Sequence, residues 1–400
     1  MGRLLYDLGV VDKRTMEKYK REAENMGKAS FALAWVLDEG TAEREHGVTI
    51  DIATNKFETA STAFTILDAP GHKDFVPNMI AGASQADFAV LVIDAGTGNF
   101  ESGLRGQTKE HALLVRSIGV QRLIVVVNKL DSVNWSQARY DEITQQISAF
   151  LTAAGFSSNR ISFVPCSGLQ GDNITRRSTA PSSNWYTGPI LLDLLENSEP
   201  STQNRTLSGP LRLPISDVFS RSVQFPISVA GRISSGSIQV GEKVVVVPGN
   251  DTAYVKGLEV NDEPAEWAVA GQNAVLHLSD IDASHLKGGD LVCSHDSPVL
   301  PRKTFSLKIL AFDHVMPIPV SVVVGRLDVP GKVKTLSALL DKTSGKAISK
   351  KKPRIIKPGE VARVEIEVDV EGGVPLEEGA RVVLRAGGET VATGLVEKMA

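Results

Sequence analysis

Cysteine and histidine are too sparse in this sequence to build a metal centre. The two cysteines, Cys166 and Cys293, form no Cys-x-x-Cys pair, and His277, His285 and His295 share no metal-ligand spacing. A zinc site or a disulfide framework is therefore not expected, and a reducing compartment is the simplest setting. We expect Cys166 to be a small buried residue and the three histidines to be structural or exposed.

Long apolar runs and a strong net charge are also missing. A membrane-spanning helix needs roughly eighteen or more consecutive apolar residues, and no stretch of the chain reaches that length. The first residues do not form a secretory signal. The net charge is only -4, so the composition indicates neither a membrane nor a nucleic acid as a general partner. We expect a soluble, cytoplasmic protein without membrane contact, and a monomer as its simplest state.

The first half of the chain has the pattern of an α/β domain. Apolar runs that read as buried strands alternate with amphipathic helical patterns. The strands are expected at 88–94, 123–128 and 161–165, and the helices at 107–118 and 136–154. This alternation predicts a doubly wound parallel sheet. Three more helical patterns precede it, at 4–8, 11–25 and 31–38.

A polar linker at 197–209 separates this half from a second half in which helical patterns nearly vanish. Short strands bounded by Gly, Pro, Asn and Asp replace them, as in small barrels. At 400 residues and 42% apolar content, the chain can build several cores. We predict a multidomain fold, α/β followed by all-β: a parallel-sheet domain at 1–200 and two antiparallel β-barrels at 208–299 and 300–400.

One apolar run, at 65–67, stops abruptly at Asp68-Ala-Pro-Gly71-His72. The run reads as a buried parallel strand, and ligands bind beyond the carboxyl ends of such strands. There Asp68 can hold Mg²⁺ through water, and Gly71 lets a backbone N–H approach a phosphate. His72 would face that phosphate and position an attacking water. The alternative is an ordinary strand-to-helix turn with a surface histidine.

A polar loop before this strand ends in Thr49. Its hydroxyl can bind a metal ion and its N–H a phosphate. The alternative is a solvated loop that leads into an edge strand.

A base-reading pattern follows the strand at 123–128. Asn128 and Asp131 lie three residues apart, so the carboxylate can accept two N–H groups of guanine while the stem of Lys129 covers the base. Ser167 and Gly168, after the next strand, would support the base. A four-residue pattern such as Asn-Lys-x-Asp also arises by chance, but its place after a buried strand favours a nucleotide site.

Together these segments resemble translational GTPases of the elongation factor one-alpha superfamily. The segment 43–49 resembles switch one and 68–72 switch two, while 128–131 and 167–169 resemble the guanine-reading motifs. Within the superfamily the chain most resembles the HBS-type GTPases of ribosome rescue that work with Pelota. The segments that carry this closer resemblance are 31–38, 106–111, 133–135 and 261–271. Release-factor GTPases are the nearest rival, but they typically have Lys where this chain has Val48.

The resemblance implies GTP/GDP and Mg²⁺ as cofactors and assigns a role to each site residue. His72 would be catalytic, Thr49 and Asp68 would hold the metal, and Gly71 would bind the γ-phosphate. Guanine would be bound by Asn128, Lys129, Asp131, Ser167, Gly168 and Leu169. The implied function is delivery of Pelota, a tRNA mimic, to ribosomes stalled in no-go and non-stop mRNA surveillance, with GTP hydrolysis.

The family's phosphate loop, Gly-x-x-x-x-Gly-Lys-Ser/Thr, does not occur in these 400 residues. It would precede the opening helix, so we expect an N-terminally truncated GTPase domain that binds GTP weakly. Three alternatives stay open: a non-hydrolysing module that binds Pelota, a release-factor-type GTPase of translation termination, and the GTPase subunit of a sulfate-activating enzyme.

A basic run at 344–354 stands out in the mildly acidic chain. Such a run is either a solvated hairpin or a docking patch for RNA or an acidic surface. We favour docking, and the resemblance implies that the two barrels hold Pelota and contact ribosomal RNA.

Overall fold

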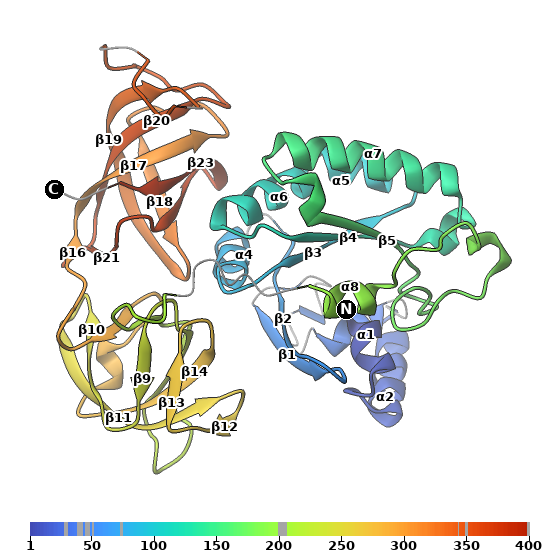
Figure 1. Cartoon of the computed structure of the whole chain (residues 1–400), viewed down its shortest axis with the longest axis horizontal. Helices are drawn as coiled ribbons and strands as arrows, with labels where there is room; N and C mark the ends of the chain where they lie inside the picture. Colours follow the sequence, from blue (N-terminus) through green and yellow to red (C-terminus); the bar gives the residue numbers. More distant parts are fainter. Residues whose placement is uncertain are drawn as a thin grey trace. The chain divides into compact units, whose positions relative to one another are not determined.

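The structure is a computed structural model of the whole chain (Figure 1). It describes residues 1–27, 31–37, 43–44, 49, 52–72, 75–198, 206–342, 344–348 and 351–397. The chain divides into two compact units, Met1–Ser201 and Thr202–Ala400. No helix in these ranges is long and apolar enough to cross a membrane. The domain boundaries expected at 200, 208 and 300 stay predictions.

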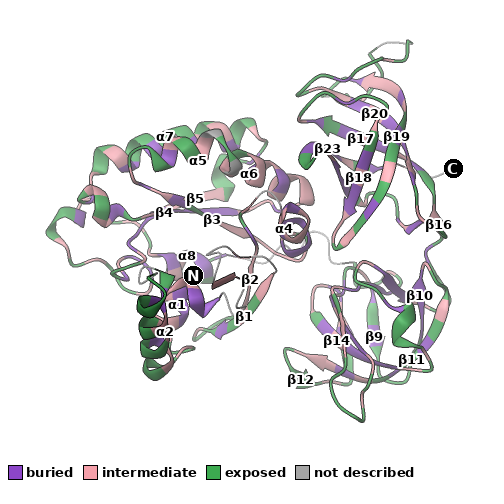
Figure 2. Cartoon of the chain, turned by 180° about the vertical axis from the view of Figure 1, so that it is seen from behind, coloured by how far each residue is buried: buried purple, intermediate pink, exposed green. Residues whose placement is uncertain are grey.

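The first unit is built around a parallel sheet in which β4 (Leu123–Asn128) lies between β3 (Ala89–Asp94) and β5 (Ile161–Pro165). The sequence of β4, Leu-Ile-Val-Val-Val-Asn, has no polar residue before its end, and its first five residues are buried, as Figure 2 shows. A strand that is apolar on both faces needs a layer on each side. The parallel sheet expected from the sequence is therefore present.

Helices supply both layers. On one face Val125 and Val127 of β4 pack in a core with Ile143 and Ile147 of α7 (Gln137–Ala153). On the other face Ile124 and Val126 share a core with residues of α1 (Gly2–Asp7) and α8 (Leu191–Glu196). The remaining helices of this unit are α2 (Lys13–Asn25), α4 (Val76–Ala83), α5 (Asn99–Arg105) and α6 (Gln107–Ile118).

The strand β2 (Ala63–Asp68) differs from the prediction of a buried parallel strand. It pairs antiparallel with β1 (Ala53–Glu58), and its residues are exposed or half-buried rather than buried. The stacked rings of Phe57 and Phe64, 4.8 Å apart, hold this pair together. Short apolar runs do not reveal the direction of their neighbours, which explains the error.

The segment 31–38 is also different from its prediction as a short helix. Within its described part Phe31 has a 3-10 conformation, and a 3-10 turn, η2 (Ala34–Val36), buries Trp35. Asp38 lies outside the described residues. The helix expected at 11–25 begins later, at Lys13, because Asp12 caps it by accepting a hydrogen bond from the Thr15 N–H at 2.6 Å.

The second unit begins with an antiparallel sheet around an apolar core. The order of its strands is β6 (Arg212–Pro214), β15 (Leu291–Ser294), β10 (Lys243–Val247), β11 (Asp251–Val260), β14 (Asn273–Ser279), β8 (Ser228–Arg232) and β7 (Asp217–Phe219), with β12 (Glu263–Pro264) on β11. A smaller pair, β9 (Ser237–Gln239) and β13 (Trp267–Val269), adds Ile238 and Ala268 to the same core.

The chain ends in a closed antiparallel barrel, which confirms the expected all-β part of the fold. Its strands follow the order β17 (Thr304–Ala311), β20 (Val361–Val368), β19 (Leu327–Leu340), β18 (Pro319–Val324), β22 (Arg381–Ala386) and β23 (Glu389–Val396). A small pair, β16 (Pro301–Arg302) and β21 (Val374–Pro375), accompanies it. Buried and half-buried residues alternate along β20, as expected where one face of a strand lines a barrel.

Candidate functional site

The polar ends of the parallel strands meet at one edge of the sheet. Asp94 at the end of β3 is aligned with Asn128 at the end of β4, and Val127 is aligned with Pro165 at the end of β5. The segments that follow these strands therefore lie side by side. This is the edge at which open α/β sheets bind ligands.

Asn128 is held in one orientation by three donors. Its Oδ1 accepts hydrogen bonds from the backbone N–H groups of Lys129 and Gly168, each at 2.8 Å, and from the thiol of Cys166 at 3.6 Å. A Cβ atom at position 168 would lie 3.2 Å from Oδ1, so a side chain there would press on the amide. With its oxygen engaged, the side chain is left with its NH₂ group as a donor for a ligand.

Asp131 has a side-chain oxygen that lacks a hydrogen-bond donor among the described residues. Its Oδ1 is buried, and no residue that the structure describes gives it a hydrogen bond. It lies in the turn η4 (Leu130–Val133), which the hydrogen bond from the Leu130 N–H to the Cys166 carbonyl, at 3.2 Å, fixes against the next strand end. A buried carboxylate oxygen without a donor is costly, by about 1–3 kcal/mol or more. A ligand with N–H groups, as guanine has, would satisfy it.

Lys129 is placed by an unusual backbone and an ion pair. Its φ is +63°, a left-handed conformation that few residues other than glycine adopt. Its Nζ lies 2.8 Å from Asp94 Oδ2. Burial acts to raise the pKa of Asp94, but the hydrogen bonds from Lys129 and the Gly96 N–H outweigh it and lower that pKa. Asp94 was not identified from the sequence, because nothing local in its strand marks it.

The base-supporting loop is tightly bonded to itself and to the first helix. Ser167 is fully buried, and its Oγ accepts from the Gln170 N–H at 3.2 Å. Leu169 leaves its side chain 70% exposed, but its carbonyl accepts a hydrogen bond from Arg3 Nη1 at 2.9 Å. Arg3, on α1, was not singled out from the sequence either. The structure thus brings together Asn128, Lys129, Asp131, Ser167, Gly168 and Leu169.

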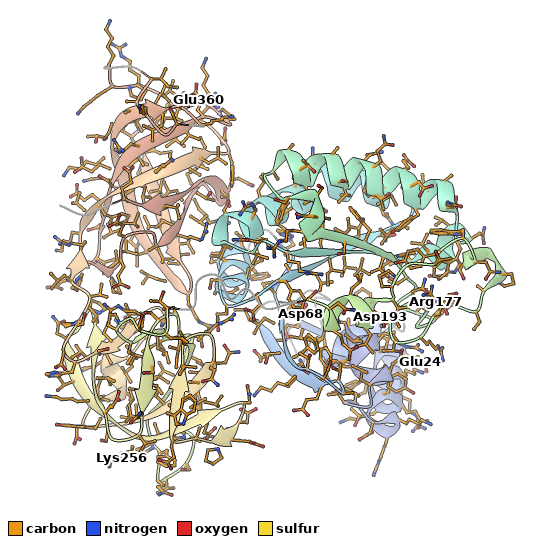
Figure 3. The ribbon with its side chains drawn as sticks, viewed as in Figure 1. Glu24, Asp68, Arg177, Asp193, Lys256 and Glu360 are labelled. Carbon is orange, nitrogen blue, oxygen red and sulfur yellow. The ribbon has the colours of Figure 1, made fainter. Side chains whose placement is uncertain are left out.

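The phosphate-sensing segment follows β2. Asp68 is the last residue of that strand and is half-buried (Figure 3). Met1, just before α1, and Ile66 of β2 pack against the same apolar core, which contains Cys166. Gly71 is exposed, and the half-buried ring of His72 lies 6.0 Å from that of Phe75.

A histidine that the sequence did not single out lies beside this segment. His111 on α6 has its Cε1 atom 3.9 Å from the position of a Cβ at Gly71. Its Nε2 is buried without a hydrogen-bond partner in the described structure. Burial lowers the pKa of His111, while Glu110 acts in the opposite direction. The imidazole next to Gly71 is therefore kept neutral over a wider pH range than a free one.

Thr49 is half-buried, but most of the expected switch one lies outside the described residues. Its neighbours 45–48 and 50–51 lie outside the described residues, so the structure does not test the arrangement of this loop. Of the segment 43–48, Glu43 and Arg44 are described, and the Arg44 guanidinium lies over the rings of Tyr19, at 5.0 Å, and Trp35, at 5.2 Å.

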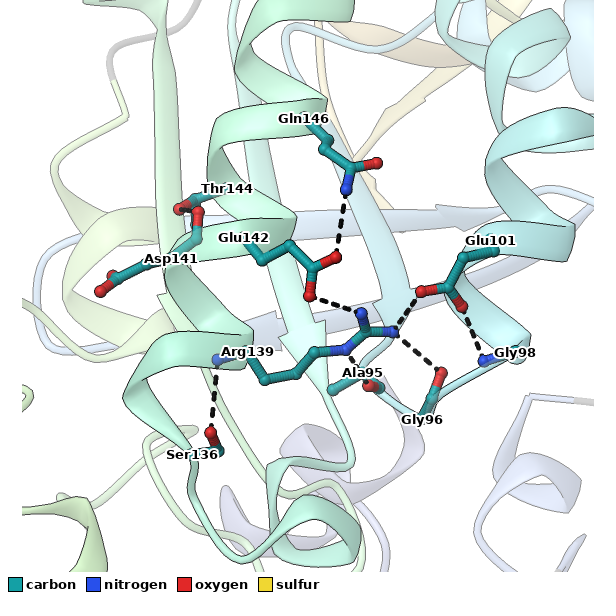
Figure 4. Close-up of polar contacts among 10 residues, drawn as sticks. All are labelled: Ala95, Gly96, Gly98, Glu101, Ser136, Arg139, Asp141, Glu142, Thr144 and Gln146. Carbon is teal, nitrogen blue, oxygen red and sulfur yellow. Dashed lines mark hydrogen bonds and ion pairs between the residues drawn. The ribbon is translucent and has the colours of Figure 1, made fainter.

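An arginine of α7 fixes the loop that follows β3. Arg139 on α7 donates to the carbonyls of Ala95 and Gly96 and pairs with Glu101 and Glu142 (Figure 4). Its side chain is only 11% exposed. The loop that begins one residue after Asp94 is thereby tied to the helix that packs under β4.

The sequence matches three family models in succession. Residues 1–209 match the elongation factor Tu GTP binding domain, residues 229–293 match elongation factor Tu domain 2, and residues 322–400 match the elongation factor Tu C-terminal domain. The chain therefore belongs to the elongation factor Tu family of GTP-binding proteins.

Among individual proteins, the chain is 41% identical to Protein HBS1 of Drosophila melanogaster, over 100% of its own length and 61% of that protein's. It is 39% identical to an elongation factor 1 alpha-like protein of Schizosaccharomyces pombe, of which it covers 67%. Its identity to elongation factor 1-alpha of Ignicoccus hospitalis is 37%, over 99% of this chain and 91% of that protein. These findings confirm the resemblance to HBS-type translational GTPases. The chain spans less than two thirds of the fly protein.

Solved structures share the fold. The GTPase-like domain of Saccharomyces cerevisiae Ski7, bound to GTP, superposes with a TM-score of 0.78 at 20% identity, over 100% of this chain and 93% of that one. The elongation factor SelB of Methanococcus maripaludis gives a TM-score of 0.68 at 22% identity, over 88% and 74% of the two chains. At these identities the likeness concerns the fold alone.

Both cysteines should resist thiol reagents in the folded protein. Cys166 and Cys293 are 2% and 0% exposed. Burial raises the pKa of the Cys166 thiol to about 12 and also raises that of Cys293. The reactive thiolate is therefore scarce at pH 8. A chromogenic disulfide reagent at pH 8 should titrate two thiols in denaturant and none rapidly in native buffer. Rapid reaction of either thiol in native buffer would contradict this.

Proposed function

We propose that the protein is a cytoplasmic GTP-binding translation factor of ribosome rescue. In this role it delivers a Pelota-type tRNA mimic to stalled ribosomes in no-go and non-stop mRNA surveillance and releases it after GTP hydrolysis. The observation that carries the proposal is the buried, unpartnered Oδ1 of Asp131 beside the fixed amide of Asn128. The 41% identity to HBS1 supports the rescue role.

Guanine recognition would use groups that are already in place. The carboxylate of Asp131 would accept two N–H groups from the base, and the NH₂ of Asn128 would donate to its other edge. The loop at Ser167, Gly168 and Leu169 would support the base with hydroxyl and backbone groups. Lys129, held by Asp94 at 2.8 Å, would cover its face with the side-chain stem. Adenine does not present two donors to the carboxylate, so it would leave Asp131 unpaired.

The phosphate end would be served by Thr49, Asp68 and Gly71. The described residues contain no group of three or more His, Cys, Asp or Glu side chains that could hold a metal ion. This fits Mg²⁺, which in nucleotide sites usually takes one or two protein ligands, with phosphate and water oxygens completing its shell. When bound, Mg²⁺ would neutralise charge on the phosphates. The Thr49 hydroxyl and the Asp68 carboxylate would hold it, and the Gly71 N–H would donate to the γ-phosphate.

Hydrolysis would depend on His72. Its ring is half-buried beside Phe75, at the point where the chain leaves β2. From there the imidazole would orient water against the γ-phosphate once the ribosome engages the factor. Loss of that phosphate would release the segments at Thr49 and Gly71 and so change the conformation that the partners bind.

A titration with GTP tests the proposal. Asp131→Asn replaces one acceptor oxygen by an NH₂ group, so it should weaken Mg²⁺-dependent GTP binding by about a hundredfold or more. The matched control, Asp141→Asn, changes an exposed carboxylate of α7 and should leave binding unaltered. Equal affinities for all three proteins would exclude guanine recognition at Asp131. If the unaltered chain shows no GTP binding, the alternative of a non-hydrolysing binding module is favoured.

The role of His72 predicts a separation of binding from turnover. In the full-length protein, His72→Ala should keep GTP affinity within about twofold and lower ribosome-stimulated hydrolysis by about a hundredfold or more. His285→Ala, which removes an exposed histidine of the second unit, is the control. Single-turnover hydrolysis with purified ribosomes measures the effect. An unchanged rate in His72→Ala would remove this residue from the mechanism.

The start of the basic run, 344–348, folds back on the end of β19, where the Ile348 N–H donates to the Leu339 carbonyl at 2.9 Å. Its turn is closed by the hydrogen bond from the Asp341 N–H to the Lys346 carbonyl, at 2.8 Å. Lys346, Lys351, Lys352 and Arg354 are exposed, whereas Lys350 lies outside the described residues. We include this surface in the proposal as a contact for the phosphates of ribosomal RNA.

Ribosome association should therefore lose part of its salt dependence when the run is neutralised. The double variant Lys351→Ala, Lys352→Ala should weaken association most at low salt and lower the slope of log K against log salt by about 1–2. The control, Lys243→Ala with Lys256→Ala, removes two exposed lysines from β10 and β11. Co-sedimentation across a salt series measures both. If the two double variants have the same salt profile, the basic run is only solvated and does not contact RNA.

A further inference from the structure

Arg3 joins the first helix to the loop that supports the base. Its Nη1 donates to the carbonyl of Leu169 at 2.9 Å, across 166 positions of sequence. Its Nε donates to Asp7 Oδ1 at 2.8 Å, one turn along α1. A planar guanidinium presents both donors in a fixed fork on separate nitrogens, whereas the donors of an ammonium group share one nitrogen.

Asp7 contacts the far end of the segment that begins at Leu169. Its second oxygen, Oδ2, accepts a hydrogen bond from the hydroxyl of Thr175 at 3.3 Å. The Arg3–Asp7 pair therefore contacts the segment 169–175 at both ends. The side chains of the two residues are 20% and 11% exposed, and the bonds of Asp7 are partly buried, whereas the bond to the Leu169 carbonyl is exposed.

The segment passes close to Arg3 at Gly171. This residue has φ of +84°, and a Cβ atom there would lie 2.7 Å from Arg3 Nη2. Any other residue would be strained and would also displace the guanidinium. The shape of the loop and the position of Arg3 therefore fit each other.

The contact between Arg3 and Leu169 can act on the Asn128 amide through Gly168. Leu169 directly follows Gly168, and the Gly168 N–H donates to Asn128 Oδ1 at 2.8 Å. The Leu169 side chain is 70% exposed and gives the loop little apolar anchorage. Without the Arg3 bond, the backbone at Leu169 would gain conformational freedom. The Arg3 bond opposes that freedom next to the residue that fixes Asn128.

We propose that Arg3 is a positioning residue for base recognition, which it serves by holding the loop 168–171 against Asn128. This inference rests on the proposed guanine site and adds to it a determinant on α1. Arg3 touches no reacting atom in this scheme. It should therefore influence how tightly and how selectively the base is bound and leave the hydrolytic step unchanged.

The test compares Arg3→Met, Arg3→Lys and the control Arg14→Met in the full-length protein. Arg14 is an exposed arginine of α2. Arg3→Met should weaken GDP binding about fivefold to tenfold, because only part of the free energy of the lost hydrogen bond reaches the base through the loop. Adenine does not pair with Asp131, so the weak affinity for ADP, measured by competition, should change less than that for GDP. Arg3→Lys should lie between wild type and Arg3→Met.

Two more readouts separate positioning from general stability. The KM for GTP should rise with the GDP dissociation constant while kcat stays unchanged, because base contacts are equal in the ground and transition states. Adding Asp7→Asn to Arg3→Met should cause little further loss, because Asn keeps one acceptor oxygen for Thr175 and the other oxygen of Asp7 has already lost its partner Arg3. Equal losses for GDP and ADP, or unchanged GDP affinity, would overturn the role of Arg3 alone. If the wild-type protein does not prefer GDP to ADP, the proposed guanine site is wrong, and this inference with it.

Discussion

The arrangement of the candidate site depends on one oxygen atom, Oδ1 of Asn128. It accepts from two backbone N–H groups and one thiol that come from two different strand ends. These bonds orient the amide only because β4 is fixed, with its first five residues buried between two helical layers. The burial of β4 therefore makes the end of this strand rigid. Asn128, its single polar residue, is held in place as a result. Folding has already ordered these groups, so a ligand that binds here does not have to order them.

Local pattern was sufficient for much of the first unit. The apolar run of β4 and the helical periodicity of α6 gave the observed bounds, because each element is long enough for burial to show in its own residues. The place of Asn128 and Asp131 was also predictable, since both follow a strand whose end must lie at the sheet edge, whereas their reading of a base stays a proposal. What these residues can bind depends on their types and their spacing, and both are visible in the sequence.

What local pattern could not show is contact across long separations. Asp94 is the partner of Lys129, 35 residues away, and Arg3 bonds to Leu169, but no feature near either residue announces the partner. The direction of β2 was missed for the same reason, because its neighbour is not encoded in its own six residues. The long strand β19 was missed differently. Its Pro330-Gly331 pair reads as a turn, yet both residues are paired within the barrel, with Ser321 and Val320.

The bond between Arg3 and Leu169 also has a consequence for how the protein is made. A nascent chain exposes its residues in order, and N-terminal domains generally fold during synthesis. The first helix must therefore wait until the segment that ends at Thr175 has left the ribosomal tunnel before its arginine finds a partner. Until then α1 can form its own turns but lacks these contacts. Residues of α1 thus reach their final contacts only after a segment 166 positions further along the chain has been made.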